Sequence, residues 1–567
     1  MRHSSIRLRV ITATCLMAIV AGCATSRTGS DSAADEIILT GTKATAQDAS
    51  REAPAPSVPA PPPPAYVNMQ GATVAPPASV MQGRMASPGV GYIRPVMVPT
   101  DPGNERYAGK EVSPVHQVRA EPVSTFSVDV DTGAYANMRR FVSAGSLPPK
   151  EAMRTEELIN YFRYDYQRPG RQEAPFTVTT DVMTTPWNPA TRLLRIGLRG
   201  YDLPRSARPP ANLVFLVDVS GSMGSPDKLP LVKTALAGLA GELSPRDKVS
   251  IVVYAGAAGL VLEPTNDERK IRAALDQLSA GGSTAGGAGL QLAYRIASDN
   301  MIEGGVNRIL LATDGDFNVG VSDTKALLQM VEHERDSGIT LTTLGFGEGN
   351  YNEAMMEQVA DHGNGNYAYI DSALEAKKVL GEQMSSTLFT IAKDVKIQVE
   401  FNPAQVSQYR LLGYENRALR EEDFNNDRVD AGDIGAGHQV TAIYEIVPAG
   451  ASGWSDPRRY DEADSLQKRG DPGEIAFVKL RYKLPNGNTS QLISQPVPTS
   501  LMLRRGAPSA DFSFAVAVAA FGQKLRGDPL LNGFSNTQII TLAGRQNDFW
   551  RQEFIRLVGV AGSLEAS

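Results

Sequence analysis

The stretch ANLVFLVDVSGSM at residues 211–223 constrains the fold more than any other part of the chain. Residues 213–217 form an unbroken apolar run, which is typical of a strand buried on both faces of a sheet. Asp218 follows the run directly, and Ser220 and Ser222 come at alternate positions in a short glycine-containing loop. A carboxylate and two hydroxyls in one loop suit a hard divalent cation. The motif alone is equally consistent with a strand end followed by a Ser/Gly turn.

Two later stretches favour the metal interpretation. The sequence GGST at 281–284 opens a helical pattern and adds the hydroxyl of Thr284. A second apolar strand, within residues 307–316, ends in Asp314. The set resembles the metal-ion-dependent adhesion site (MIDAS) of von Willebrand factor type A (VWA) domains, whose pattern is D-x-S-x-S, then Thr, then Asp. The matching residues are Asp218, Ser220, Ser222, Thr284 and Asp314.

The resemblance implies a bound divalent cation, with Mg²⁺ as the first choice and Ca²⁺ or Mn²⁺ as alternatives. It implies that the hydroxyls of Ser220, Ser222 and, with a partner bound, Thr284 touch the metal. Asp218 and Asp314 would then act largely through water. A coordination position would stay open for a carboxylate of a protein partner.

Residues 208–392 alternate apolar strand patterns with helical ones, which predicts an α/β fold with a doubly wound, mainly parallel, Rossmann-like sheet. The first helix repeats leucines at helical spacing after an expected cap at Asp227. Ligands bind beyond the carboxyl ends of the strands in such sheets. Asp218 and Asp314 are both expected there.

The N-terminus has the layout of a bacterial lipoprotein signal. Arg2, Arg7 and Arg9 precede an apolar run at 10–20 that is too short for a standard transmembrane helix. Small residues then lead to Cys23, so residues 1–23 resemble a lipoprotein signal peptide with Cys23 as the lipidated residue. By resemblance to the lipoproteins of bacteria with two membranes, Ala24 at the next position implies the outer membrane, facing the periplasm.

The rest of the chain divides by composition and periodicity. Residues 24–118 are rich in proline, with twelve between 51 and 100, and are expected to form a disordered tether. Residues 119–207 form an N-terminal accessory region, 393–505 a β-rich region and 506–567 C-terminal helices. Strands at 176–201 would make only a marginal hairpin alone. They are therefore expected to pair with strands at 393–495, so that the VWA domain is inserted into a β-sandwich.

A wider resemblance covers most of the expected ordered part. The segments STFSVDVDTGAYANMRRF, GYENR and DIGAGHQVTAIYE, on either side of the VWA domain, resemble the bacterial YfbK-like lipoproteins. This resemblance implies an architecture and a cell-envelope setting, and it implies no established activity.

The leading functional hypothesis is a membrane-tethered binding module, not an enzyme, that contacts a protein partner through the metal. One alternative is a metal-dependent hydrolase, for which Asp316 is a candidate base; the five histidines form no close-spaced cluster. Another is a passive envelope scaffold with a structural metal. The net charge of −6 argues against a nucleic-acid partner. No sequence feature indicates an oligomeric state.

Overall fold

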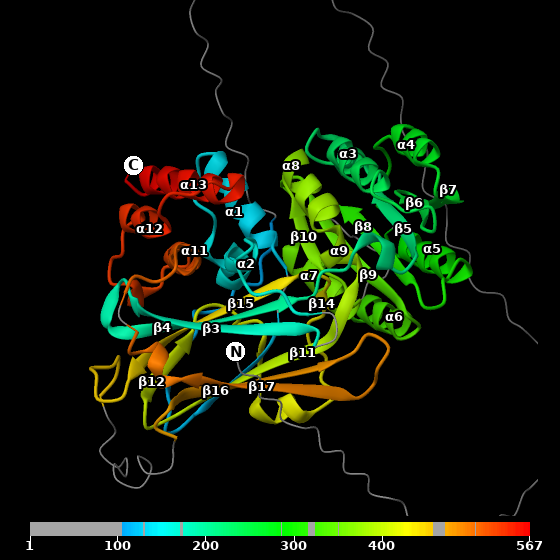
Figure 1. The fold of residues 1–567 in the computed structure, drawn as a ribbon. Coiled ribbons are helices and arrows are strands. Elements are labelled where there is room, and N and C mark those ends of the chain that lie inside the picture. The colour runs from blue at the N-terminus through cyan, green and yellow to red at the C-terminus, as the bar shows by residue number, and fades with distance from the viewer. Residues whose placement is uncertain are drawn as a thin grey trace, which may run out of the picture. The chain divides into compact units, whose positions relative to one another are not determined.

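A six-stranded sheet between residues 211 and 370 lies on the right-hand side of Figure 1. The computed structural model describes residues 105–128, 131–170, 174–284, 286–315, 324–349, 351–456, 471–504 and 506–566. In spatial order the strands are β10 (Tyr367–Ile370), β9 (Ile339–Phe346), β8 (Val306–Thr313), β5 (Ala211–Asp218), β6 (Lys248–Tyr254) and β7 (Ala258–Thr265). Every neighbouring pair is parallel except β6 with β7. The doubly wound α/β fold predicted from the sequence is confirmed.

Both faces of this sheet are buried under helices, which explains the unbroken apolar run in β5. Leu213, Phe215 and Val217 belong to one core cluster with side chains of α3 (Leu229–Ala240) and α4 (Glu268–Asp276). Val214 and Leu216 belong to another, on the opposite face. The helices of that second cluster are α5 (Gly286–Asp299), α6 (Thr324–Asp336) and α7 (Glu353–His362). Alternate residues of a strand point to opposite faces, so a strand covered on both sides needs apolar residues throughout.

Two antiparallel sheets pack as a sandwich beside this domain. One has the order β1 (His116–Gln117), β12 (Val406–Leu411), β15 (Gln439–Pro448), β4 (Asn188–Gly200) and β3 (Phe176–Thr185). The other has the order β13 (Ala418–Leu419), β2 (Val123–Ser127), β11 (Thr390–Phe401), β16 (Glu474–Lys483) and β17 (Ser490–Pro498), with β14 (Ile434–Gly435) paired to β11. Phe401 of one sheet stacks on Tyr409 of the other, with ring centroids 4.3 Å apart.

The sandwich is built from both flanks of the α/β domain, as predicted. Strand β4, which precedes the domain, pairs with β15, which follows it, and Leu194 lies opposite Tyr444. Strand β2 likewise pairs with β11. The structure moves one boundary, however. Residues 116–117 already form the edge strand β1 against β12, so the ordered part begins before the expected limit at 118.

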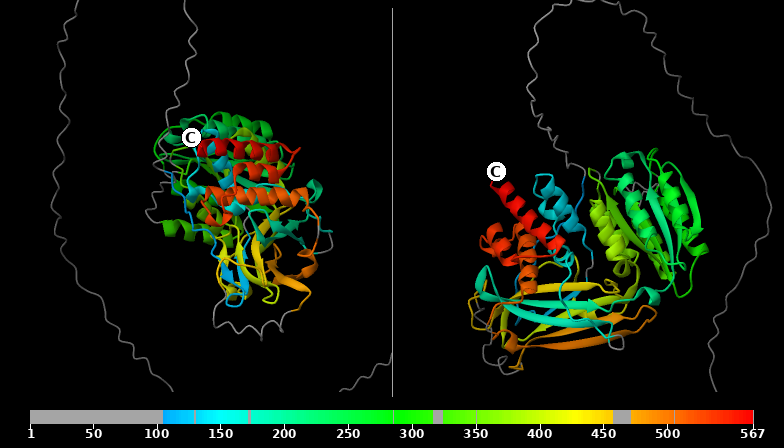
Figure 2. Two further views of the ribbon diagram at one scale, coloured as in Figure 1. Left: turned by 90° about the vertical axis from the view of Figure 1, so that its left-hand side faces the viewer. Right: turned by 45° about the horizontal axis from the view of Figure 1, so that its top comes forward.

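Helices from the two ends of the described chain form a third layer (Figure 2). They are α1 (Gly133–Ser143), α2 (Thr155–Asn160), α11 (Ala510–Leu525), α12 (Asn536–Ala543) and α13 (Phe549–Glu565). Phe162, Phe514 and Phe554 meet edge to face in their shared core. Within the described residues no helix combines the length and the apolar character needed to cross a membrane.

Buried ion pairs join this helical layer to the α/β domain. Arg154 pairs with Glu353 and Glu357 of α7 at 3.1 and 2.6 Å. Arg139 of α1 pairs with Asp371 and Glu375 at 2.5 and 2.7 Å.

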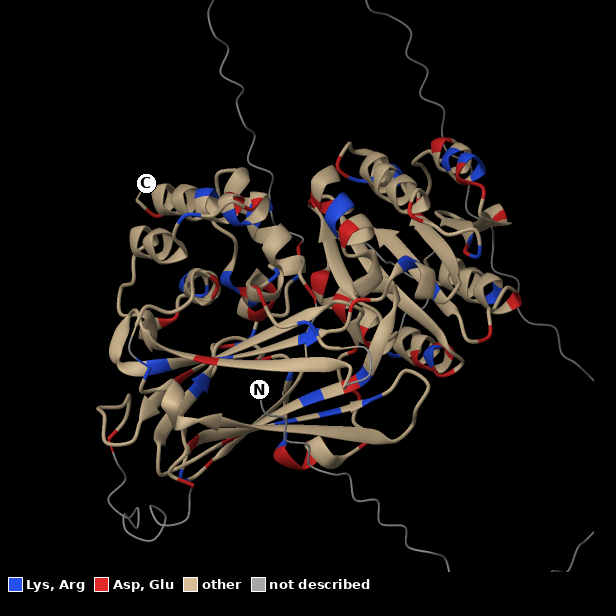
Figure 3. Ribbon diagram, viewed as in Figure 1, with Lys and Arg blue, Asp and Glu red and all other residues tan. Residues whose placement is uncertain are grey.

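The remaining short elements are η1 (Lys150–Ala152), η2 (Arg205–Ala207), η3 (Gly221–Gly224), α8 (Ala373–Lys377), η4 (Lys378–Glu382), α9 (Met384–Leu388), η5 (Glu421–Asn425), η6 (Thr499–Leu501) and η7 (Pro529–Leu531). Elsewhere basic and acidic residues are mixed over helices and strands (Figure 3).

Candidate metal site

Asp218 is the last residue of β5 and is fully buried. Its Oδ1 accepts a hydrogen bond from the backbone N–H of Ser220 at 2.9 Å. Its Oδ2 accepts one from the hydroxyl of Thr313 on the neighbouring strand β8 at 3.0 Å. Because β5 and β8 are parallel and in register, their carboxyl ends meet at one edge of the sheet. Asp218 and Asp314 thus both lie at this edge, as expected.

The two serines lie in the turn that follows β5. The hydroxyl oxygens of Ser220 and Ser222 are 3.0 Å apart, and Ser220 is buried while Ser222 is half-buried. Backbone hydrogen bonds join this turn to the glycine-rich loop: Gly221 N–H donates to Gly282 O at 3.0 Å, and Gly281 N–H donates to Val219 O at 2.8 Å. The two loops that carry the predicted hydroxyls are therefore held side by side.

Thr284 lies at the end of the glycine-rich loop, just before α5, and is half-buried. Helix α5 packs closely on β6 because Gly289 has no side chain. A Cβ at Gly289 would lie 2.7 Å from the Cβ of Tyr254, which is too close for any other residue without movement. The glycines of this segment thus bring the loop of Thr284 to the same edge of the sheet.

Asp314 is the first residue after β8 and is 1 % exposed. Its Oδ2 accepts a hydrogen bond from Nζ of Lys228 at 3.0 Å, and the lysine side chain is itself 8 % exposed. Lys228 is the N-cap residue of α3. The expectation that Asp227 caps this helix is wrong, because the side chain of Asp227 instead accepts a hydrogen bond from the hydroxyl of Ser225.

The electrostatics of the site favour a cation. Burial raises the pKa of the Asp218 carboxyl, and the nearby charge of Asp314 raises it further, against the hydrogen bonds from Ser220 and Thr313 that lower it. Two carboxylates removed from water are mutually unfavourable unless positive charge lies between or beside them. Lys228 supplies part of that charge to Asp314.

The donor set is that of a hard metal ion. It consists of carboxylate and hydroxyl oxygens, which suit Mg²⁺ and Ca²⁺ better than soft metals. Over the described part of the chain, no group of three or more His, Cys, Asp or Glu residues is suited to hold a metal. A cation at this site would therefore depend on the hydroxyls of Ser220, Ser222 and Thr284 as well as on the two carboxylates.

Thr313 and Lys228 contact the predicted site residues and were not predicted from the sequence. Thr313 links the strands, since its hydroxyl donates to Asp218 and accepts from the N–H of Gly315 at 3.2 Å. The sequence did place Thr313 directly before Asp314 in a buried strand, and this position could have indicated a role at the site. Lys228 had no such local signal, because its contact with Asp314 spans 86 positions of sequence and depends on the fold.

Two of the described histidines, His116 and His362, make contacts away from the predicted site. Nδ1 of His116 lies 2.5 Å from Glu121, and Nδ1 of His362 lies 2.8 Å from the carbonyl oxygen of Gln358 in its own helix. Asp316, the candidate base of a hydrolase, lies outside the described residues.

The fold and this constellation define a VWA domain, and the comparisons with known proteins agree. The family model "von Willebrand factor type A domain" matches residues 212–383, and "von Willebrand factor" matches 101–195. "Uncharacterized protein YfbK, C-terminal" matches residues 386–564.

The Escherichia coli (strain K12) protein "Uncharacterized protein YfbK" is 48 % identical over 476 residues, which is 82 % of each chain. The chain belongs to the YfbK family. An uncharacterized protein of Synechocystis is 28 % identical over 56 % of this chain and 73 % of its own. A solved von Willebrand factor type A structure from Catenulispora acidiphila is 17 % identical, covering 70 % of this chain and 91 % of its own, with a TM-score of 0.39.

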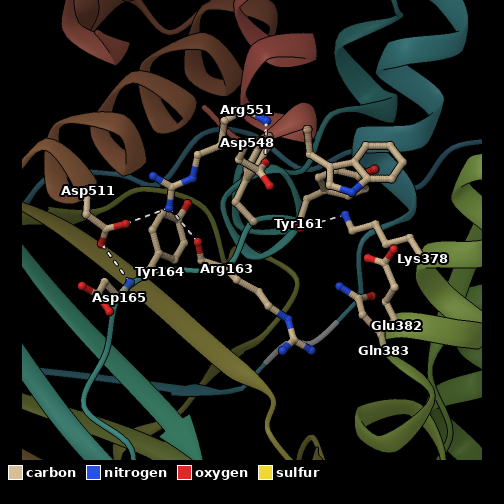
Figure 4. A pocket seen from close by; sticks show the side chains of 12 residues that line it. Tyr161, Arg163, Tyr164, Asp165, Lys378, Glu382, Gln383, Asp511, Asp548 and Arg551 are labelled. Atoms are coloured by element: carbon tan, nitrogen blue, oxygen red, sulfur yellow. Dashed lines mark hydrogen bonds and ion pairs between the residues drawn. The ribbon is translucent and has the colours of Figure 1, made fainter. Parts of the chain in front are cut away.

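A separate cavity of about 570 Å³ lies between the VWA domain and the helical layer (Figure 4). Arg551 on its wall pairs with Asp511 at 2.7 Å and donates to the carbonyl oxygen of Arg163 at 2.6 Å. Lys378 of η4 donates to the carbonyl oxygen of Tyr161 at 2.9 Å, and its Nζ lies 2.7 Å from the centre of the Tyr161 ring. The Lys378–Tyr161 contact joins the VWA domain to the helical layer, whereas the contacts of Arg551 lie within the helical layer.

Lys378 should make the stability of the chain depend on pH. Burial lowers the pKa of its amine from 10.5 to about 7. Between these values the unfolded chain binds a proton that the folded chain does not, so the unfolding free energy falls as the pH drops from 10 to 7. Each unit of pKa difference corresponds to about 1.4 kcal/mol. The unfolding free energy of Lys378→Met should therefore rise relative to that of wild type as the pH drops from 10 to 7.

Denaturant unfolding at pH 10, 8.5 and 7 measures this difference. Lys377→Met is the matched control, because it removes a lysine at the exposed neighbouring position. It should follow wild type at every pH. An equal pH dependence in Lys378→Met and wild type would show that Lys378 is charged at neutral pH in the folded protein.

Proposed function

We propose that this chain is a membrane-tethered VWA binding module of the bacterial cell envelope, and not an enzyme. Its site would hold one divalent cation, Mg²⁺ in the first place and Ca²⁺ or Mn²⁺ as alternatives. That cation would coordinate a carboxylate of a protein partner, for adhesion or for assembly of a complex. The observation that carries the proposal is the convergence of the Asp218 turn, the Thr284 loop and Asp314 at one edge of the sheet.

Each part of the site has a distinct role in this proposal. The hydroxyls of Ser220, Ser222 and Thr284 would provide neutral ligands, and the buried carboxylates of Asp218 and Asp314 would provide negative charge behind them. Because most of its direct ligands would be neutral, a bound ion would stay electrophilic and could accept a further carboxylate oxygen. Thr284 is half-buried on a separate loop, which makes its hydroxyl the ligand most dependent on the bound state.

Thr284→Ala tests the open position. The side chain is small, so the melting temperature should stay near that of wild type, while most metal-dependent partner capture should be lost. The measurement is capture of proteins from native membranes by the detergent-solubilised full-length chain, with and without EDTA. Thr234→Ala, on the exposed face of α3, is the matched control and should behave as wild type.

Three results would overturn this view. If Thr284→Ala captures the partner as wild type does, and EDTA still abolishes capture, the partner does not use an open metal position. If capture by wild type survives EDTA, the passive scaffold with a structural metal is favoured. Hydrolysis that depends on the metal in purified protein would favour the hydrolase instead.

The location is part of the same proposal. A lipid at Cys23 would hold the chain at the outer membrane, facing the periplasm. Cys23→Ala should move the protein from the membrane fraction to the soluble fraction. If the variant still sediments with membranes after a high-salt wash, a lipid at Cys23 is not the anchor.

A further inference from the structure

Lys228 directly contacts Asp314, one of the residues of the predicted metal site. Its Nζ lies 3.0 Å from Oδ2 of Asp314, and the two side chains are 8 % and 1 % exposed. Because the pair is buried, water screens the interaction between its two charges only weakly. Any second cation bound near Asp314 would therefore interact strongly with this ammonium group.

The surroundings of Lys228 are shaped for its side chain. Gly347, in the loop after β9, has a φ of +75° and lies against the lysine stem. A Cβ at Gly347 would be 2.3 Å from Cγ and 2.4 Å from Cε of Lys228. Only glycine leaves room for the stem on this path to Asp314.

Helix stability does not account for a lysine at this position. Lys228 is the N-cap of α3, where the backbone N–H groups point toward the side chain and the helix dipole disfavours a cation. Serine, threonine, aspartate and asparagine are the preferred N-caps. Asp227, one position earlier, bonds to Ser225 instead. The contact that compensates for this unfavourable placement is the one with Asp314.

We propose that Lys228 is a built-in competitor of the metal: it neutralises Asp314 in the metal-free protein and lowers the affinity of the site for a divalent cation. The inference rests on the proposed metal site and adds the residue that sets its affinity. A divalent cation and the ammonium group would share one buried carboxylate, and like charges at such distances repel. Metal binding would weaken the Lys228–Asp314 pair, and this coupling links the metal state of the site to the start of α3 and to the loop at Gly347.

The test uses the detergent-solubilised full-length chain with Lys228→Met, which keeps the length of the stem and removes the charge. Titration calorimetry with Mg²⁺ should show an affinity higher than that of wild type by on the order of 10-fold or more, the effect of removing one adjacent charge. The melting temperature in EDTA should fall, because Asp314 loses its contact with the buried ammonium group. Saturating Mg²⁺ should restore most of this loss.

Two further variants make the comparison specific. Lys233→Met removes the same charge from the same helix, where Nζ donates to the carbonyl oxygen of Asp276 at the surface. It should leave both the affinity and the melting temperature unchanged. Lys228→Gln removes the charge but keeps a hydrogen-bond donor, and it should also bind Mg²⁺ more tightly if Lys228→Met does not fold.

The outcomes separate this inference from the proposed function. Equal Mg²⁺ affinity in wild type and in the folded Lys228 variants would overturn the inference and leave the metal site intact. Weaker binding in those variants would also overturn it, since Lys228 would then support the metal. Saturable binding that appears only in the variants would support the inference, but it would contradict a metal-loaded wild-type module. Absence of binding in wild type and in every variant would contradict both.

Discussion

Asp218→Ala is expected to lower the affinity of the chain for Mg²⁺ by roughly 10- to 100-fold, the range seen when an outer ligand of a metal site is removed. The carboxylate lies behind both serines, and it is held by the Ser220 N–H and the Thr313 hydroxyl. Its removal takes a negative charge from beneath the ion and frees the Ser220 turn. Asp218→Asn, which keeps the shape, should show most of the same loss.

Thermal unfolding with and without Mg²⁺ measures this effect. At a concentration about 100 times its dissociation constant, a ligand that binds only the folded state stabilises that state by about 2.7 kcal/mol. Wild type should gain this amount, and Asp218→Ala should gain little at the same concentration. Asp227→Asn is the control, since that aspartate lies in the same segment and bonds to Ser225. If Asp218→Ala gains as much stability from Mg²⁺ as wild type does, the metal binds somewhere other than this site.

Arg410→Ala is expected to reduce the unfolding free energy by about 3–5 kcal/mol, the usual loss when one partner of a buried ion pair is removed. Arg410 lies on β12 and is 1 % exposed. Its guanidinium reaches Glu445 of β15 at 2.8 Å and Asp528, before η7, at 2.6 Å, and both carboxylates are fully buried. The substitution leaves two carboxylates without their cation and loosens the helical layer from the sandwich.

Denaturant unfolding compares this variant with Arg481→Ala. Arg481 pairs with Asp427 at 3.0 Å, but the side chains are 22 % and 39 % exposed. Such a surface pair is worth about 0–1 kcal/mol, so its removal should change stability little. Similar losses in the two variants would mean that the Arg410 cluster contributes no more than an ordinary surface pair.

The sheet and the edge that carries the site could be predicted because their signals are local. The apolar run of β5 predicts burial on both faces. The carboxylates at the ends of β5 and β8 must lie together once these strands are parallel neighbours. The pairing of β4 with β15 also followed, because an isolated hairpin at 176–201 would be marginally stable. In each case one pattern in the sequence had one stable structural solution.

The ionic contacts could not be predicted, because charged residues carry no local sign of burial. Lys228 follows a residue that capping preferences would select, and only the fold shows that its side chain reaches Asp314 across 86 positions of sequence. Arg410 and Asp528 are 118 positions apart. Pairing of this kind depends on tertiary geometry, and the periodicity of a strand or helix does not indicate it.

The helical layer shows the same limit. Apolar faces on α2 and α11 are visible in the sequence, but their contact joins segments from opposite ends of the described chain. The ordered part begins before residue 118 for a similar reason. Glu105 accepts a hydrogen bond from the N–H of Gly349 at 3.1 Å, so its partner lies in the loop after β9, far along the chain.

Equilibrium dialysis of the detergent-solubilised full-length protein against Mn²⁺ tests the central claim most directly. Wild type should hold one ion per chain in a saturable way, excess Mg²⁺ should displace it, and Asp218→Asn should hold far less at the same free concentration. Binding of equal strength in wild type and Asp218→Asn, or no saturable binding in wild type, would contradict a metal site formed by Asp218, Ser220, Ser222, Thr284 and Asp314.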